Sequence, residues 1–190
     1  MKRFCFILFV GIILLASCMQ KSSKIDLESY LEYQKKGTEI SQVAQSALLV
    51  NVGKAIQKGG PEYAVEFCNL QASSIVDGLN SVHNCVISRV SEKNRNPENR
   101  LKNEGEIELW NLFQNKLLAD TLVQNKQKLV YYKPIRIGMP ACLKCHGNPD
   151  SEISLGTMKK LQSLYPNDLA IGYKLNDFRG LWKIEFEKKP

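Results

Sequence analysis

The sequence predicts an α+β domain in which helices come first and an antiparallel sheet follows. Two observations lead to this prediction. Apolar residues recur at a spacing of three and four between residues 25 and 79, whereas β-branched and aromatic residues gather in short segments of the second half. Short helical segments separate these strand-like segments, and long crossover helices do not alternate with them, which favours antiparallel pairing.

The first 24 residues predict export from the cytoplasm. A short basic segment precedes an apolar run from Phe4 to Leu15, which suits the core of a signal peptide but is short for a membrane span of about 20 residues. Residues 15–18 (Leu-Ala-Ser-Cys) resemble a bacterial lipobox, in which Cys18 is lipidated and becomes the N-terminus. Alternatively, residues at the N-terminus form an ordinary cleaved signal peptide, and Cys18 has no part in lipidation. We therefore divide the chain into a lipoprotein signal peptide, the lipidated cysteine with a polar tether, and one folded domain, at residues 1–17, 18–24 and 25–190.

The charge balance restricts the classes of partner. The chain has 26 basic and 19 acidic residues, and removing residues 1–17 leaves a net charge of +5 without any long basic block. Nucleic-acid-binding proteins concentrate their basic residues on one surface, often beside aromatic ones. We therefore expect no nucleic acid as a partner. The partners that we expect are a membrane, reached through the lipid anchor, and an unidentified redox or signalling protein.

Two long helices are predicted at the start of the domain. The first runs from Ile25 to about Lys58 along one apolar stripe, and Gly59-Gly60 ends it. Pro61 suits the first turn of a second helix, which runs to Leu79. Cys68 falls on the apolar face of this second helix, so its thiol is expected to point toward the core. The long amphipathic first helix also suits pairing with a second copy of the chain or with a receptor.

The second half of the domain reads as short strands and helices. In chain order, we predict a strand at 86–90, a turn-rich loop at 94–99, an amphipathic helix at 104–118, a strand at 128–137, a short helix at 154–165, and strands at 169–175 and 181–186. The last two strands are predicted to form a hairpin around Asn176-Asp177.

The segment Cys142-Leu-Lys-Cys145-His146 is the attachment sequence for c-type haem. Two thiols at this spacing form thioether bonds to the haem vinyl groups, and the adjacent histidine becomes an iron ligand. A bare Cys-x-x-Cys also occurs in zinc sites and redox dithiols, but a dithiol has no use for the histidine. A structural zinc site needs four ligands, and the further candidates are Cys68, Cys85 and His83, without a second Cys-x-x-Cys.

Cys68 and Cys85 are left over once the motif and Cys18 are assigned. In an oxidising compartment the ordinary interpretation is a disulfide between them. The alternative is that Cys68 binds the haem iron, since its position on the core-facing side of a helix suits a buried ligand.

Five segments in this order resemble the PAS-like monohaem c-type family, an exported haem-binding domain long catalogued as a domain of unknown function and also found in bacterial sensor ectodomains. They are Ile87–Asn99 (ISRVSEKNRNPEN), Tyr132–Ile135 (YKPI), Cys142–Gly147 (CLKCHG), Ala170–Tyr173 (AIGY) and Asp177–Gly180 (DFRG). The resemblance covers the chain from about Leu31 to Ile184. One departure is Asn176, where the family often has glycine, although asparagine tolerates the same positive φ.

The resemblance implies a PAS-like central antiparallel sheet with flanking helices, preceded by long N-terminal helices. It also implies one covalent haem c, with His146 as the proximal iron ligand and the Cys68 thiolate as the distal one. Met139, Met158 and His83 are the other candidates for the distal ligand, and an open distal site is the remaining alternative. Three further residues are candidates for hydrogen bonds to the haem propionates, or else merely fix a turn: Arg89, Arg95 and Asn96.

The predicted function is that of an exported, membrane-tethered monohaem c-type cytochrome in the bacterial cell envelope, facing the periplasm. A thiolate ligand lowers the reduction potential of haem, so electron transfer or the sensing of redox state or a diatomic gas is expected. The alternative is a small haem enzyme of the peroxidase or nitrogen-oxide reductase type with a displaceable distal ligand. A metal-free structural lipoprotein with a Cys142–Cys145 disulfide is a further alternative.

Overall fold

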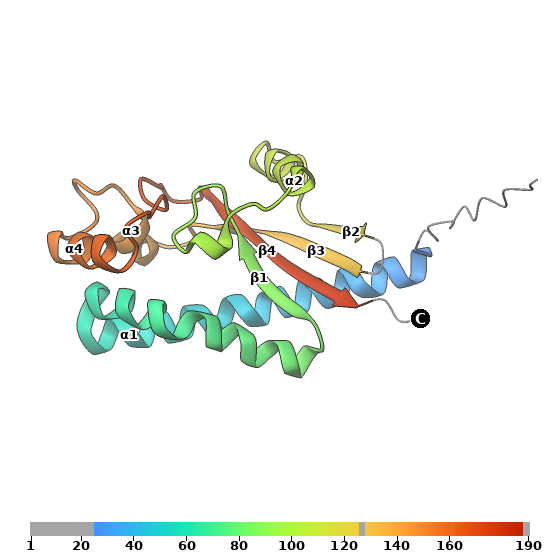
Figure 1. The fold of residues 1–190 in the computed structure, drawn as a ribbon, viewed down its shortest axis with the longest axis horizontal. Coiled ribbons are helices and arrows are strands. Elements are labelled where there is room, and N and C mark those ends of the chain that lie inside the picture. Colours follow the sequence, from blue (N-terminus) through green and yellow to red (C-terminus); the bar gives the residue numbers. More distant parts are fainter. Residues whose placement is uncertain (1–24, 126–127, 188–190) are drawn as a thin grey trace, which may run out of the picture.

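The computed structural model of the protein describes residues 25–125 and 128–187. A four-stranded antiparallel sheet forms its centre, with a long helical hairpin on one face and a short helix on the other, as Figure 1 shows. Two further short helices lie beyond one end of the sheet. The predicted α+β class, with a central antiparallel sheet and long N-terminal helices, is confirmed.

Helix α1 (Leu27–His83) contains both predicted N-terminal helices. Gly59 (φ −155°, ψ 24°) and Gly60 (φ 74°, ψ −174°) leave helical geometry, so the helix is kinked where the sequence predicts a stop. Figure 1 shows the two arms, residues 27–58 and 61–83, folded back beside each other. Gly60 has a backbone conformation that is open essentially only to glycine, which explains why the reversal occurs at this pair.

The sheet has the strand order β1-β4-β3-β2, and all neighbouring strands are antiparallel. Its strands are β1 (Val86–Val90), β2 (Thr121–Asn125), β3 (Lys128–Arg136) and β4 (Phe178–Glu187). The strands predicted at 86–90, 128–137 and 181–186 are therefore present, and β2 was not predicted. β2 pairs antiparallel with β3, and Thr121 lies opposite Tyr132 in this pair.

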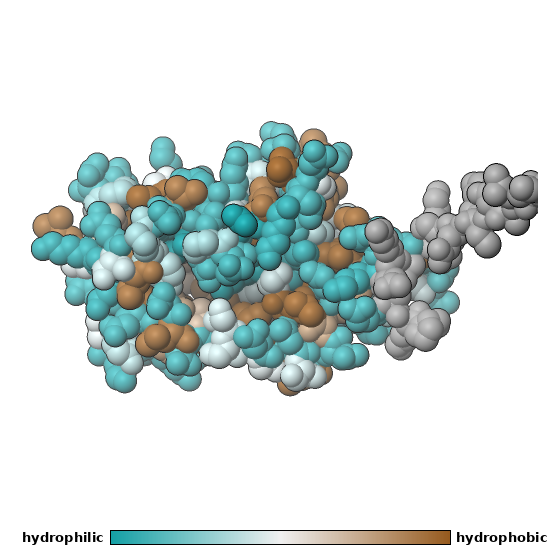
Figure 2. All heavy atoms as spheres, in the orientation of Figure 1, coloured by the Kyte–Doolittle hydropathy of each residue, from teal (hydrophilic) through white to brown (hydrophobic). Residues whose placement is uncertain are grey.

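Alternating side chains give the sheet two apolar faces. One face packs against α1, with Tyr131, Trp182 and Ile184 among its buried residues. The other face packs against α2 (Glu104–Gln114) through Trp110 and Phe113. In Figure 2 the outer surface on the viewed side is mostly hydrophilic, as expected for a domain with both sheet faces covered.

The other helices are short, and side chains cap the starts of α2 and α4. The side chain of Asn103 accepts from the Glu106 N–H at the start of α2, and Ser154 caps α4 (Leu155–Leu164) in the same way through Thr157. Helix α3 (Pro140–His146) begins with proline at its first position and contains the whole Cys-x-x-Cys-His segment. A 3₁₀ turn, η1 (Pro97–Asn99), lies within the predicted loop at 94–99.

The strand predicted at 169–175 is wrong, and so is the hairpin that it would form. The backbone of this segment bonds to loops and to the end of α3: Leu169 N–H donates to the Asn94 carbonyl, and Tyr173 N–H donates to the His146 carbonyl. Alternation of side chains thus reflects an extended segment packed across α3 rather than a sheet strand. The turn itself is present, and Asn176 adopts the positive φ of 69° that the sequence allows.

Within residues 25–125 and 128–187, the structure has no helix that is both long enough and apolar enough to cross a membrane. The predicted signal peptide, Cys18 and the tether to residue 24 lie outside the described residues.

Candidate functional site

A cavity of about 430 Å³ lies between the two arms of α1, the sheet and α3. This volume is in the range of pockets that hold small molecules and cofactors. Both arms of α1 supply apolar side chains to its wall, and β1, β4 and the end of β3 supply the opposite side. The apolar residues contributed by α1 are Leu48, Leu49, Val52, Ile56, Ala64, Val65 and Ala72.

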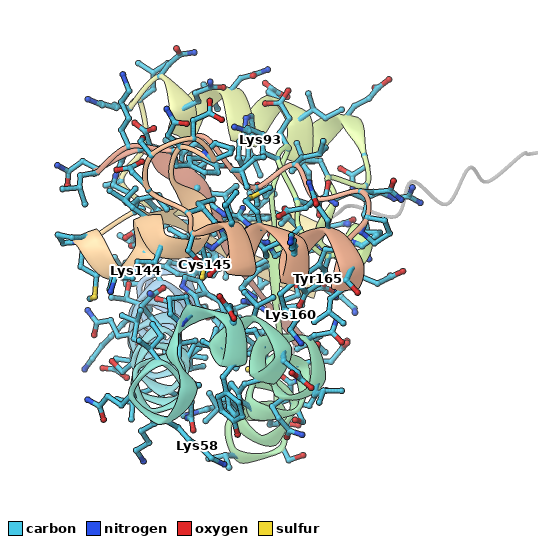
Figure 3. The ribbon with its side chains drawn as sticks, turned by 90° about the vertical axis from the view of Figure 1, so that its left-hand side faces the viewer. Lys58, Lys93, Lys144, Cys145, Lys160 and Tyr165 are labelled. Carbon is cyan, nitrogen blue, oxygen red and sulfur yellow. The ribbon has the colours of Figure 1, made fainter. Side chains whose placement is uncertain are left out.

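All three functional residues of the predicted attachment motif line this cavity: Cys142, Cys145 and His146. Pro140 starts α3, so the motif forms two turns of helix that place both thiols and the ring on the cavity side. Figure 3 looks onto this end of the molecule, where Cys145 lies between Lys93 above and the α1 turn carrying Lys58 below. The structure therefore brings together the residues that covalent haem attachment requires.

His146 is held in one orientation by the segment that crosses α3. Its Nδ1 donates to the Ala170 carbonyl oxygen at 2.8 Å, and the Tyr173 ring meets it edge-on at 6.3 Å between centroids. Burial lowers the pKa of His146 well below its usual value, and the nearby guanidinium groups of Arg95 and Arg179 lower it further. The imidazole is therefore neutral, and its Nε2 keeps the lone pair that binds a metal.

Cys68 lines the same cavity from the second arm of α1. Burial raises the pKa of its thiol, while Arg89 and Arg95 act in the opposite direction. The three other candidates for a distal ligand, His83, Met139 and Met158, are not among the residues that line the cavity. Of the four, Cys68 is therefore the candidate that lines the same cavity as His146.

The four cysteines of the described residues are free thiols. Cys85 is buried in the core between α1 and the sheet and does not line the cavity, so the predicted alternative of a Cys68–Cys85 disulfide is not formed. Cys142 and Cys145 are likewise unbonded to each other. No cluster of three or more His, Cys, Asp or Glu side chains that could hold a metal ion occurs in the described part of the chain.

Four arginines line the cavity, namely Arg89, Arg95, Arg136 and Arg179. No Asp or Glu side chain of the described residues lines it. The guanidinium of Arg89 lies 6.0 Å from the centre of the Trp182 ring. Arg179 donates from Nη1 to Ser91 Oγ at 3.0 Å, yet its Nε is buried without a hydrogen-bond partner among the described residues. A wall with this charge and a spare buried donor fits an apolar group that carries carboxylates.

Arg95 and Asn96 both reach the cavity, but their hydrogen bonds are to the protein. Arg95 donates from Nη2 to the Cys145 carbonyl at 2.6 Å and pairs with Asp168 at 2.9 Å. The side chain of Asn96 accepts from the Glu98 N–H and caps η1. The structure therefore gives both residues a part in holding the local backbone, which is the turn-forming role considered from the sequence.

Sequence reasoning did not select Arg179, Arg136 or Tyr165, which also line the cavity. Arg179 lies in the Asp177–Gly180 segment that contributed to the family resemblance, so that segment was the available signal. Tyr165 ends α4 with its ring 5.9 Å from the Arg95 guanidinium. Nothing in the sequence distinguishes its position from ordinary core.

The fold and the cavity define a class of protein: an α+β domain whose two-armed helix and Cys-x-x-Cys-His helix enclose a positively charged cofactor pocket. The family model described as Tll0287-like, Tll0287, matches residues 18–186. The chain therefore belongs to the Tll0287-like family, and the family resemblance inferred from the sequence is confirmed.

Among solved structures, the crystal structure of the cyanobacterial heme-protein Tll0287 is similar to this chain with a TM-score of 0.61 and 18% sequence identity. The match covers 87% of this chain and 98% of that one, so the two share nearly the whole fold. A comparison with curated protein sequences finds no match.

Proposed function

We propose that this protein is an exported, membrane-tethered monohaem c-type cytochrome. The observation that carries the proposal is the meeting of Cys142, Cys145, His146 and Cys68 around one apolar, arginine-lined cavity. Thioether formation needs the two thiols, and iron ligation needs the neutral imidazole. The similar fold of a protein described as a heme-protein supports the proposal.

Each residue has a defined part in holding the group. Cys142 and Cys145 would form the thioether bonds, His146 would bind the iron through Nε2, and Cys68 would supply its second protein ligand. Arg89 and Arg179 are the best candidates for the haem carboxylates, because the hydrogen bonds of Arg95 and Asn96 are taken by the protein. When bound, the haem supplies a one-electron couple at iron.

A histidine and a cysteine as the two iron ligands would favour electron transfer or sensing. A cysteine thiolate donates electron density to iron and lowers its potential, in contrast to methionine, which raises it. Apolar walls on α1 and burial at the sheet limit access of water to the group, which also tunes the potential. We propose that the protein carries one electron, or reports redox state or a diatomic gas, to a protein partner in the periplasm-facing envelope.

Haem attachment is the first test. The mature chain is expressed in a host with c-type maturation, and the haem remaining on the denatured chain is measured as a pyridine haemochrome. We expect one two-thioether haem per chain, and none in a Cys142→Ser/Cys145→Ser variant. A haem-free or fully extractable product in the wild-type protein contradicts the proposal. Cys85→Ser is the matched control, because this thiol lies outside the cavity.

A second measurement separates carriage and sensing from catalysis. Ferrous protein is titrated with carbon monoxide and nitric oxide, and the ferric protein is assayed with peroxide and nitrite. Binding of a gas that displaces Cys68 supports gas sensing, whereas reversible one-electron cycling without gas binding supports electron transfer. Steady turnover of peroxide or nitrite would contradict the proposal and favour a haem enzyme.

A further inference from the structure

The carbonyl oxygen of Ala170 accepts two hydrogen bonds, and one of them comes from His146. His146 Nδ1 donates to this oxygen at 2.8 Å, and Arg95 Nη2 donates to it at 3.3 Å. Ala170 is fully buried, so water does not compete for the oxygen. The imidazole therefore shares its acceptor with a cation.

Arg95 is fixed in this position by more than one contact. Its Nε donates to Asp168 Oδ2 at 2.9 Å, and its Nη2 donates to the Cys145 carbonyl at 2.6 Å. Asp168 in turn accepts from the Ala170 N–H through Oδ1 at 2.8 Å. The Arg95–Asp168 pair thus holds both the last turn of α3 and the backbone of Ala170. The carbonyl oxygen of Ala170 is the acceptor of the hydrogen bond from His146.

The sharing of this oxygen affects the electron density on the imidazole. A metal-bound histidine becomes a stronger electron donor when its other nitrogen donates to a strong acceptor. A guanidinium on the same oxygen draws charge away from that acceptor and weakens the hydrogen bond from His146. A weaker hydrogen bond leaves the imidazole less electron-rich, which favours the reduced iron.

We propose that Arg95 is a positioning residue that limits the strength of the His146–Ala170 hydrogen bond and thereby holds the haem reduction potential up. This inference rests on the proposed haem binding. It assigns Arg95 a role toward iron that would act through His146 and the Ala170 carbonyl.

The test compares two substitutions that each remove one positive charge from the cavity wall, Arg95→Gln and Arg136→Gln. Arg136 also lines the cavity, but its hydrogen bond is to the Asn176 carbonyl and not to Ala170, and it has no proposed part in holding the haem. We expect Arg95→Gln to lower the potential by at least a tenfold change in the one-electron equilibrium constant, about 59 mV, and by more than Arg136→Gln does.

A vibrational measurement separates the hydrogen bond from the charge. The iron–histidine stretch of the ferrous protein is recorded by resonance Raman spectroscopy in a Cys68→Ala background, which removes the opposite ligand. A stronger Nδ1 hydrogen bond raises this frequency, so we expect an upward shift in Arg95→Gln and no shift in Arg136→Gln. Equal shifts in both variants, or no shift in Arg95→Gln, overturn the inference.

Arg95→Lys covers the case in which Arg95→Gln does not fold or load haem. Lysine keeps the charge but has a single ammonium in place of the planar fork that reaches Asp168, Cys145 and Ala170 together. We expect a potential and a stretch between those of the wild type and Arg95→Gln, and values equal to the wild type in both overturn the inference. Covalent haem is quantified in every sample. A wild-type chain without haem contradicts the proposed function, whereas the outcomes named above for haem-loaded samples overturn the inference on Arg95.

Discussion

Replacing Gly37 by alanine is predicted to destabilise the protein, although helix propensity favours alanine. It lies inside the first arm of α1, where replacing glycine by alanine normally stabilises by about 1 kcal/mol. A Cβ at this position would lie 2.7 Å from Cδ2 of Tyr131 and still closer to Cγ. Tyr131 is fully buried and is held by a 2.9 Å hydrogen bond between its hydroxyl and Thr38 Oγ1, so the ring has no free space to enter.

The cost of Gly37→Ala follows from these contacts. Overpacking a core site costs about 1–3 kcal/mol, and loss of the Thr38–Tyr131 hydrogen bond costs about 1 kcal/mol more. After the gain in propensity, the net change is a loss of about 1–3 kcal/mol in the free energy of unfolding. Gly53 is the matched control, because it lies in the same arm and an added Cβ there meets nothing within 4 Å.

Urea unfolding of the two variants tests this prediction. Gly53→Ala is expected to stabilise the protein by about 1 kcal/mol, so the two variants should differ by about 2–4 kcal/mol with unchanged slopes. If Gly37→Ala is as stable as Gly53→Ala, the close contact of α1 with the sheet at Tyr131 is not as described, and the reasoning fails.

Three further outcomes are expected. Cys68→Ala should raise the reduction potential of the haem-loaded protein and change its native visible spectrum, because a thiolate donor is lost; spectroelectrochemistry measures both, and an unchanged spectrum would exclude Cys68 as a ligand. Gly60→Ala should destabilise the protein by about 1–3 kcal/mol in thermal or urea unfolding, since φ of 74° with ψ of −174° strains any other residue. Burial alone would raise the pKa of Glu185, but hydrogen bonds from Lys183 and Lys128 outweigh it and lower this pKa below its ordinary 4.5. The Glu185 carboxylate therefore stabilises the fold above pH 4.5, and this stabilisation is lost as the pH falls through the lowered pKa of the folded state. In Glu185→Gln the free energy of unfolding should fall less steeply with decreasing pH, as measured by unfolding at a series of pH values.

The helical half of the fold was predictable because local signals agree there. The apolar stripe, the Gly59-Gly60 pair and Pro61 all mark the same reversal, and α1 kinks at that point. Strand β2 was missed because the segment 121–125 is short and has one buried residue, Leu122. The segment at 169–175 was mistaken for a strand because alternation reports an extended backbone and does not reveal the partner of its hydrogen bonds.

The Cys-x-x-Cys-His motif was recognisable because the spacing that covalent haem attachment would need lies within five consecutive residues. The contacts of Arg95 with Cys145, Asp168 and Ala170 were not predictable, since they join segments that are 50 to 75 residues apart. Only the fold brings such groups together. The same holds for Arg179, whose Nε is buried without a partner among residues 25–125 and 128–187, which no neighbour in sequence reveals.

Cys68 on α1 and His146 on α3 line one cavity, and this has a consequence for the unfolded chain. An iron atom bonded to both would close a loop of roughly 80 residues, and the chain-entropy model gives such a cross-link about 4.5 kcal/mol of stabilisation. That is the contribution expected of a disulfide across the same span. The cofactor would then give this domain, whose described cysteines are all free thiols, the cross-linking that many secreted proteins obtain from paired cysteines.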